Sequence, residues 1–291
     1  GSMRVWYMIS QTALELGYEL IVIGIPKTVD NDLMYTDHAP GYGSAAKFLA
    51  TCVLDISMDI TSLLKNKRVT IIETMGRNTG WLAASCALAG LRGTNVPPLI
   101  YIPEEPFQME SFLKDVCAQN EQFGCSLVVV SEGIRDQSGK LLAEETLSHD
   151  MVGRPQLGGV SAYLAQRVRE KTGLQVRNVL PSIWQRSGMM FSSKTDVEEA
   201  YRAGCHAFHF AQRGITGVMV FLERISNQPY KISYQHVPLE LVADREKMFP
   251  LEWYNSRTRS VKEPFIEYVQ PLIRGEVFVP MDNGLPVYQT I

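Results

Sequence analysis

The feature that decides the fold is the stretch ELIVIGIPKTVDND, which occupies residues 19–32. Its first half, residues 19–25, is a nearly uninterrupted apolar run, and continuous rather than alternating hydrophobicity is typical of a strand buried on both faces. Gly24 permits a tight exit from such a strand, and Pro26 fixes its own φ just beyond it. The stretch therefore predicts a buried strand that ends in a sharp turn.

A lysine, a threonine and two aspartates follow this predicted strand, at Lys27, Thr28, Asp30 and Asp32. In open α/β sheets, ligands bind outside the carboxyl ends of the strands. Such a cluster can contain a general base, a metal-associated acid and a cation that binds an anion. The alternative is an Asp/Asn turn that caps a helix, with a surface lysine beside it.

The same pattern of strand followed by helix continues along the chain. Apolar, β-branched runs predict strands at residues 19–25, 68–73, 98–102, 126–131, 176–180 and 217–222. Helices are predicted between them, at residues 3–15, 43–65, 79–91, 110–123, 158–171 and 195–212. This alternation is typical of an α/β protein with mainly parallel sheets. From about residue 240, a rise in proline, aromatic and charged residues favours helix and irregular wrapping over another βαβ unit.

The composition excludes several classes of protein. The chain has 291 residues, 45% hydrophobic and 20% charged, which is enough for a sizeable core in two domains or one large one. Its net charge of -3 argues against nucleic acid or an anionic membrane as a partner. No apolar run approaches the ~20 residues that a membrane helix needs. Five scattered cysteines without a CxxC pair indicate a reducing compartment and argue against a disulfide framework or a zinc site.

A second candidate cluster lies at residues 73–80, where another predicted strand ends ahead of an Ala-rich helix. Gly76 and Gly80 allow the backbone to approach a ligand closely, and the start of a helix favours an anion. Arg77 adds a cation that can contact an anion through two hydrogen bonds. The alternative is a strand-to-helix turn in which Asn78 caps the helix.

A glutamate and three more arginines complete the set of candidates. Glu132 ends a third predicted strand, where a carboxylate can accept hydrogen bonds from a polyol, although an ordinary loop acid would look the same. Arg177 and Arg186 flank an apolar stretch and suggest another anion contact, with solvated charges as the alternative. Arg68 lies at the opposite end of its strand from Arg77, so these two can serve one site only at a subunit junction.

Three strand exits thus supply Asp30, Arg77 and Glu132. Phosphoryl transfer to a phosphorylated polyol needs a base for the hydroxyl, cations for the phosphate charge and a hydrogen-bonding sugar site. The residues alone predict this class of reaction and no further detail.

At these residues the sequence resembles the phosphofructokinase family. The matching signatures are Pro-x-Thr-x-Asp-Asn-Asp at residues 26–32, Met-Gly-Arg at residues 75–77, the strand-end Glu132, and Gln-Arg-x-Gly at residues 185–188. They occur in the family's order and spacing across nearly the whole chain. Two departures stand out: Ile183 and Trp184 replace a stretch that often holds His or Tyr, and the family's glycine-rich donor loop is missing.

The resemblance implies a fold of two Rossmann-like, three-layer α/β/α domains with mainly parallel sheets, the first of them N-terminally incomplete. It implies a donor-side domain formed by residues 1–66 plus 189–291 and a fructose 6-phosphate-binding domain formed by residues 67–188. A dehydrogenase with a dinucleotide-binding fold is disfavoured, because the chain lacks the Gly-x-Gly-x-x-Gly that should follow a strand.

The resemblance also implies roles for the candidate residues. Asp30 is the expected general base for the 1-hydroxyl of fructose 6-phosphate, with Lys27 and Thr28 as its catalytic companions. Asp32 is expected near Mg²⁺, which it would contact through water. The substrate-binding residues that the resemblance implies are Thr28, Asp30, Arg68, Met75, Gly76, Arg77, Glu132, Arg177 and Arg186. Arg68 and Arg177 are expected to reach the neighbouring active site in a homodimer or homotetramer.

The phosphoryl donor is expected to be pyrophosphate, because Lys27 resembles pyrophosphate-dependent members of the family. Gly1, Ser2 and Lys27 are the expected donor-binding residues, although Gly1-Ser2-Met3 also looks like a cloning scar. ATP is the alternative donor. A non-catalytic sugar-phosphate-binding fragment or regulatory subunit is the alternative from another class. As a family member, the protein is expected to be a cytoplasmic enzyme of glycolysis.

Overall fold

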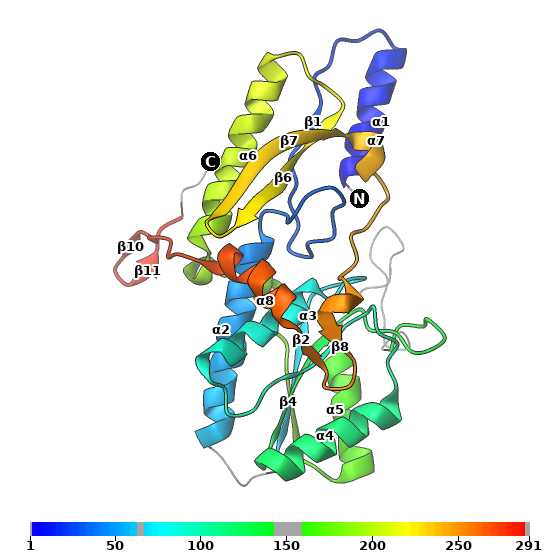
Figure 1. Ribbon diagram of the computed structural model, residues 1–291, viewed down its shortest axis with the longest axis vertical. Coiled ribbons are helices and arrows are strands. Elements are labelled where there is room, and N and C mark those ends of the chain that lie inside the picture. The colour runs from blue at the N-terminus through cyan, green and yellow to red at the C-terminus, as the bar shows by residue number, and fades with distance from the viewer. Residues whose placement is uncertain (1, 63–66, 143–158, 289–291) are drawn as a thin grey trace.

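A computed structural model describes residues 2–62, 67–142 and 159–288 of the chain. The molecule is elongated, with a three-stranded sheet toward one end and a four-stranded sheet toward the other (Figure 1). Most of the candidate residues, with the exception of Arg68 and Arg177, lie where the two sheets face each other, so the packing of each sheet determines the geometry of the site.

The four-stranded sheet is fully parallel. Its strand order is β3 (Leu99–Tyr101), β4 (Ser126–Ser131), β2 (Val69–Thr74) and β5 (Val176–Val179). Every residue of β2 and β4 is buried, as the continuous apolar runs predict. Side chains of these strands alternate between two separate cores. One core contains α2 (Tyr42–Ser62) and α3 (Trp81–Ser85), and the other contains α4 (Met109–Phe123) and α5 (Val160–Thr172).

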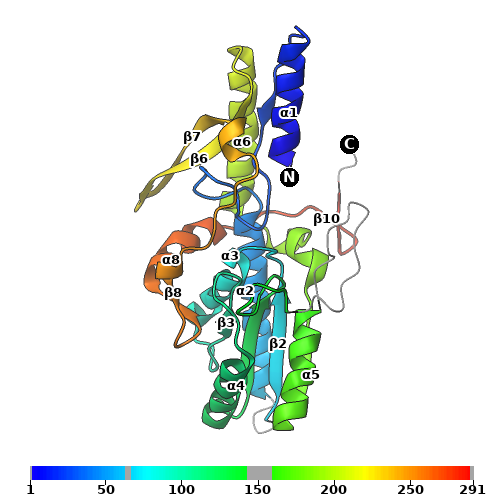
Figure 2. The same cartoon turned by 90° about the vertical axis from the view of Figure 1, so that its right-hand side faces the viewer.

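The smaller sheet is mixed. Its order is β1 (Ile23–Gly24), β6 (Val218–Asn227) and β7 (Tyr230–Pro238); β1 is parallel to β6, whereas β7 is antiparallel to it. One face packs on α1 (Ser2–Glu15) and α7 (Leu239–Val242), and the other packs on α6 (Lys194–Gln212). Figure 2 shows α1 and α6 on opposite sides of this sheet.

The first strand is shorter than the sequence predicts. Within the described residues β1 pairs only with β6, so it is the edge of its sheet. Leu20, Ile21 and Ile25 are 40%, 52% and 45% exposed, which means that the expected burial of residues 19–25 on both faces is wrong at both ends of the run. The predicted helix at residues 79–91 also differs: α3 has five residues, and the chain continues as a 3₁₀ helix over Cys86–Arg92.

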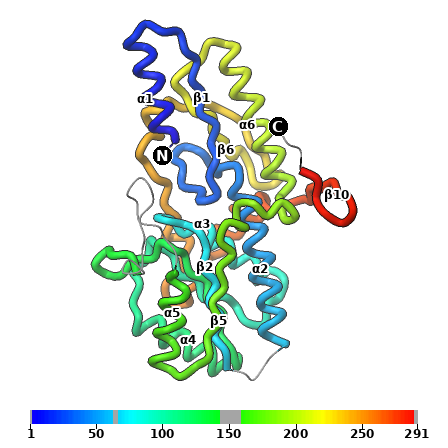
Figure 3. The backbone as a smooth tube through the Cα atoms, turned by 180° about the vertical axis from the view of Figure 1, so that it is seen from behind, coloured from blue at the N-terminus to red at the C-terminus, as the bar shows by residue number. Residues whose placement is uncertain are grey.

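The C-terminal part wraps around the four-stranded sheet. After α7 it forms the short pair β8 (Tyr254–Asn255) and β9 (Ser260–Val261), then α8 (Glu263–Val269) and the hairpin of β10 (Met281–Asp282) and β11 (Leu285–Pro286). Figure 3 shows this hairpin projecting from the side of the molecule. Aromatic contacts hold this segment in place, because Trp81 of α3 packs against Phe249, Trp253, Phe265 and Tyr268.

The cores cross the domain boundaries that the resemblance implies. Eight of the ten buried residues of α2, together with Phe249, Phe265 and Leu272, share a core with the four-stranded sheet. The boundaries at residues 66 and 188 stay a prediction. No helix among the described residues is long and apolar enough to cross a membrane. All five cysteines are free.

Candidate active site

The carboxyl ends of β2, β4 and β5 meet the turn after β1 at one cavity of about 500 Å³. Parallel strands end on the same edge of a sheet, which is why residues far apart in sequence converge there. The cavity is lined by Lys27, Thr28, Val29, Asp30, Glu73, Thr74, Met75, Arg77, Glu132, Leu180, Ser182, Ile183, Gln185 and Arg186. The structure therefore brings together the main catalytic, sugar and anion candidates of the sequence.

Two carboxyl groups in this cavity have strongly raised pKa values. Burial raises the pKa of Asp30 to about 6; the neighbouring Asp32 carboxylate adds to the shift, and Arg77 opposes it. Burial also raises the pKa of Glu132 to about 7, with further contributions from the charges of Asp30 and Glu73. A carboxyl group that titrates near neutral pH can accept a proton and release it again, as a general base must.

The loop after β2 is held tightly against the end of β4. Gly76 has φ +127°, and a Cβ there would lie 2.5 Å from the carbonyl oxygen of Thr79. A Cβ on Gly133 would lie 1.9 Å from the Arg77 carbonyl oxygen, so only glycine fits at this crossing. The Ser131 hydroxyl donates to the Gly76 carbonyl at 2.6 Å. These contacts fix the main chain on both sides of Arg77.

Neighbouring elements hold the same loop from two other sides. The Thr79 hydroxyl donates to the Asp30 carbonyl oxygen at 3.2 Å, which joins the two strand-exit turns. The Met75 N–H donates to the Gln185 side-chain oxygen at 2.9 Å. Gln185 is buried in the 3₁₀ helix Ser182–Arg186, so its hydrogen bond also orients the segment that carries Arg186.

The structure corrects the role of Asn78 and adds two residues. Gly80, not Asn78, is the N-terminal capping position of α3. The Asn78 amide instead donates to both oxygens of Glu246, at 2.9 and 3.0 Å. Glu73 is buried and accepts hydrogen bonds from the N–H groups of Gly159 and Ser161, at 3.0 and 2.8 Å, so it caps the start of α5. Neither acid has a local sequence signal, because its partners lie 86 to 168 residues away.

A second cavity, of about 710 Å³, adjoins the first and shares Lys27 and Thr28 with it. Asp32 and Ser2 line it, together with Arg4 and Arg245. Burial raises the pKa of Asp32 above its ordinary value. Ser2 therefore lies on the same cavity as Lys27, as the donor-site expectation requires, whereas Gly1 falls outside the described residues.

Arg68 and Arg177 lie at the other end of the four-stranded sheet. Arg177 is in register with Thr70 near the start of β2, and both arginines line a separate cavity of about 660 Å³. Arg177 also forms an ion pair with Asp59 at 2.9 Å. The interpretation that Arg177 and Arg186 form one anion contact is therefore wrong within one chain. Arg177 lies in β5 and lines this separate cavity, whereas Arg186 follows the other end of β5 and lines the first cavity.

The chain is similar to several known proteins. Residues 1–211 match the family model described as phosphofructokinase. The chain is 39% identical over 285 residues to a pyrophosphate–fructose 6-phosphate 1-phosphotransferase of Xanthomonas campestris, and it covers 68% of that protein. About 97% of this chain takes part in the match.

Two solved structures are also similar. One is a pyrophosphate-dependent phosphofructokinase from Nitrosospira multiformis, with a TM-score of 0.88, 37% identity and coverage of 99% of this chain and 69% of that one. The other is a pyrophosphate-dependent phosphofructokinase from Marinobacter aquaeolei, with a TM-score of 0.86, 36% identity and coverage of 98% and 68%. The chain thus spans about two thirds of the length of these relatives.

Proposed function

Because the chain belongs to the phosphofructokinase family, we propose that it transfers a phosphoryl group from pyrophosphate to the 1-hydroxyl of fructose 6-phosphate. The observation that carries this proposal is the pair of adjoining cavities. Asp30, Arg77, Glu132 and Arg186 line the first, and the second shares Lys27 with it. An acceptor and a donor can therefore meet at Lys27 and Thr28 while each occupies its own cavity.

The proposal assigns a residue to each step of the transfer. The acceptor sugar occupies the first cavity, where Arg77 and Arg186 attract its phosphate and Glu132 accepts hydrogen bonds from its hydroxyls. Asp30 takes the proton of the 1-hydroxyl as that oxygen bonds to the nearer phosphorus of pyrophosphate. The bond from this phosphorus to the bridging oxygen breaks, and inorganic phosphate leaves from the second cavity. Lys27 offsets the charge on the donor.

Magnesium is part of the proposal, and the available carboxylates fit one mode of binding it. Mg²⁺ is usually held by one or two carboxylates together with substrate phosphates and water. In the part of the chain that the structure describes, no three His, Cys, Asp or Glu side chains form a metal-binding group. Asp32, on the second cavity beside Lys27, suits an ion that it would contact through water and that the donor's phosphates would complete. When bound, such an ion neutralises charge on the donor.

Pyrophosphate is favoured over ATP by Lys27 and by the names of the similar proteins. We further propose a homo-oligomer in which Arg68 and Arg177 bind the acceptor phosphate of a neighbouring subunit, because within one chain they lie at the far end of β2 and β5 from Asp30.

A donor comparison tests the proposal. The full chain is assayed with fructose 6-phosphate, Mg²⁺ and either pyrophosphate or ATP. We expect turnover with pyrophosphate and little with ATP. Product from ATP alone would refute the proposed donor, and binding of fructose 6-phosphate without turnover from either donor would favour a non-catalytic protein. The Asp30→Asn variant should lose several orders of magnitude in kcat, whereas Asp55→Asn, a change on the exposed side of α2, should not.

A further inference from the structure

Asn31 separates the two carboxylates of the site. It lies between Asp30, which lines the first cavity, and Asp32, which lines the second. Asn31 is completely buried and has φ +55°, a left-handed conformation that asparagine tolerates better than most residues. This one turn of the backbone sends the two neighbouring carboxylates into different cavities, so whatever holds Asn31 also sets their directions.

The Asn31 side chain is held at both ends. Its oxygen accepts hydrogen bonds from the Ala39 N–H at 3.0 Å and from the Lys247 ammonium at 3.3 Å. Its amide nitrogen donates to the Tyr268 hydroxyl at 2.9 Å. Two of these partners, Lys247 and Tyr268, belong to the C-terminal segment that wraps the four-stranded sheet.

Lys247 contacts several other groups near the turn besides Asn31. Its ammonium also donates to the carbonyl oxygens of Thr36 and Asp37, at 3.1 and 2.8 Å, and it stands 5.0 Å above the centre of the Trp81 ring. Its main-chain N–H donates to the Asp32 carbonyl oxygen at 2.7 Å. Burial lowers the pKa of Lys247 to about 8.

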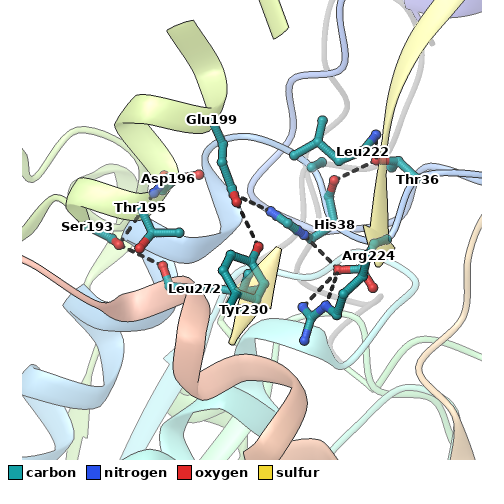
Figure 4. Close-up of polar contacts among 12 residues, drawn as sticks. Thr36, His38, Ser193, Thr195, Asp196, Glu199, Leu222, Arg224, Tyr230 and Leu272 are labelled. Carbon is teal, nitrogen blue, oxygen red and sulfur yellow. Dashed lines mark hydrogen bonds and ion pairs between the residues drawn. The ribbon is translucent and has the colours of Figure 1, made fainter. Parts of the chain in front are cut away.

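The turn that begins at Asn31 continues to His38, where a buried ionic network fixes it (Figure 4). His38 contacts Asp37 at 2.8 Å and Glu199 of α6 at 2.6 Å. Arg224 of β6 forms an ion pair with Asp37 at 2.8 Å. Residues 31–38 are therefore anchored to the smaller sheet at one end, and Lys247 joins their other end to Trp81 beside the larger sheet.

We infer that Lys247 is a positioning residue of the active site, which acts through Asn31 to orient Asp30 and Asp32. Lys247 does not line either cavity, so it is not expected to touch a substrate. Lys247 forms hydrogen bonds to the turn that carries the base. The Trp81 indole N–H also donates to the Lys247 carbonyl oxygen at 3.0 Å, which joins Lys247 to the helix that follows the Arg77 loop. The inference rests on the proposed function, because it assigns Lys247 to the geometry of that reaction.

Replacement of the ammonium tests this role. Lys247→Met keeps most of the side-chain stem and removes the hydrogen bonds. We expect kcat to fall about 10- to 100-fold while KM for both substrates changes less than about threefold. Lys262→Met, at an exposed lysine that donates to the Glu252 carbonyl, is the matched control and should behave like the wild type. An unchanged kcat, or a rise in KM alone, would overturn the inference.

A double substitution separates positioning from general loss of structure. In an Asn31→Ala background, Lys247→Met should lower kcat by less than about threefold further, because the residue through which it acts is gone. If Lys247→Met lowers kcat by the same factor in both backgrounds, the role is structural and the inference fails. Should Lys247→Met not fold, Tyr268→Phe removes the opposite bond to Asn31 and should give a smaller change of the same kind; no change in kcat there would count against the inference.

One measurement needs no turnover and so stays informative if the proposed function is wrong. The Asp30 pKa, about 6 here, is set by burial and by Asp32, Arg77, Glu246 and Lys27. The Lys247 charge lowers the pKa of Asp32, and Asp32 in turn raises the pKa of Asp30, so the same titration is repeated in an Asn31→Ala background, where loss of the charge acts alone. The part of the Asp30 pKa change that Lys247→Met causes only when Asn31 is present reports movement of the carboxyl group. Carbon-13 titration of Asp30 should show a shift of at least about half a unit toward its ordinary value. An unaltered titration would refute positioning, whereas absence of turnover in the wild type would refute only the proposed function.

Discussion

Replacement of the proposed base should stabilise the protein while it abolishes catalysis. The pKa of Asp30 is about 6, against an ordinary value of 3.8. The folded state therefore binds this proton more tightly than the unfolded state does. Protonation of Asp30 therefore stabilises the folded state in full at pH values below about 4, and this stabilisation is lost as the pH rises through about 6.

The size of the effect follows from the shift. A difference of about 2 pKa units corresponds to about 3 kcal/mol, at about 1.4 kcal/mol per unit. An asparagine side chain is uncharged at every pH and has nearly the same shape, so Asp30→Asn should raise the free energy of unfolding by up to about 3 kcal/mol at pH 8. At pH 5 the charged form is only partly populated in the folded state, and the gain should be about 1.5 kcal/mol.

Urea unfolding of the wild type and Asp30→Asn at both pH values measures these gains. Asp55→Asn, at an exposed carboxylate of α2, is the control and should change stability little at either pH. A gain that is equal at pH 5 and pH 8 would show that the substitution stabilises for another reason. A loss of stability at pH 8 would refute the burial argument altogether.

Three further predictions test other parts of the site. Since Asp30 must be ionised to act as a base, kcat/KM should fall about tenfold per pH unit below pH 6 and level off above it; a flat profile from pH 5 to 8 would exclude Asp30 as the base. Arg68→Ala and Asp30→Asn chains should each be inactive but regain about a quarter of wild-type activity when refolded together in equal amounts, because a mixed dimer has one intact site; no recovery would place Arg68 outside the neighbouring site. Glu73→Ala should lower the free energy of unfolding by about 1–3 kcal/mol, since it leaves the Ser161 N–H at the start of α5 unpaired, whereas exposed Glu121→Ala should not; urea unfolding measures both.

The elements that the sequence predicts well are those packed on both sides. β2 and β4 are buried throughout, so their apolar runs carry no competing signal. β7 was not predicted, because it is antiparallel and half-exposed, and polar residues interrupt its pattern. The opposite error occurs at Ile21, which belongs to an apolar run but lies beyond the paired part of β1 and is exposed.

The candidate site divides in the same way. Asp30, Arg77 and Glu132 could be predicted because each follows a recognisable strand directly, and parallel strands end together. Lys247 could not, because a lysine in an irregular segment has no pattern and its partners at residues 31–37 lie more than 200 positions earlier. Gln185 lies within a recognisable motif, but its bond to Met75 spans 110 residues and is visible only in the fold.

The cations of the site have a second consequence for the base. Lys27 and Arg77 both lower the pKa of Asp30, and in their absence burial and Asp32 would raise it further. They are also the groups that line the cavities where the substrate anions are proposed to bind. A bound phosphate neutralises part of their charge and adds its own, so Asp30 becomes more basic once the substrates are present. The free site thus keeps its carboxylate ionised at neutral pH, and occupation of the site strengthens that carboxylate as a proton acceptor when the 1-hydroxyl is in place.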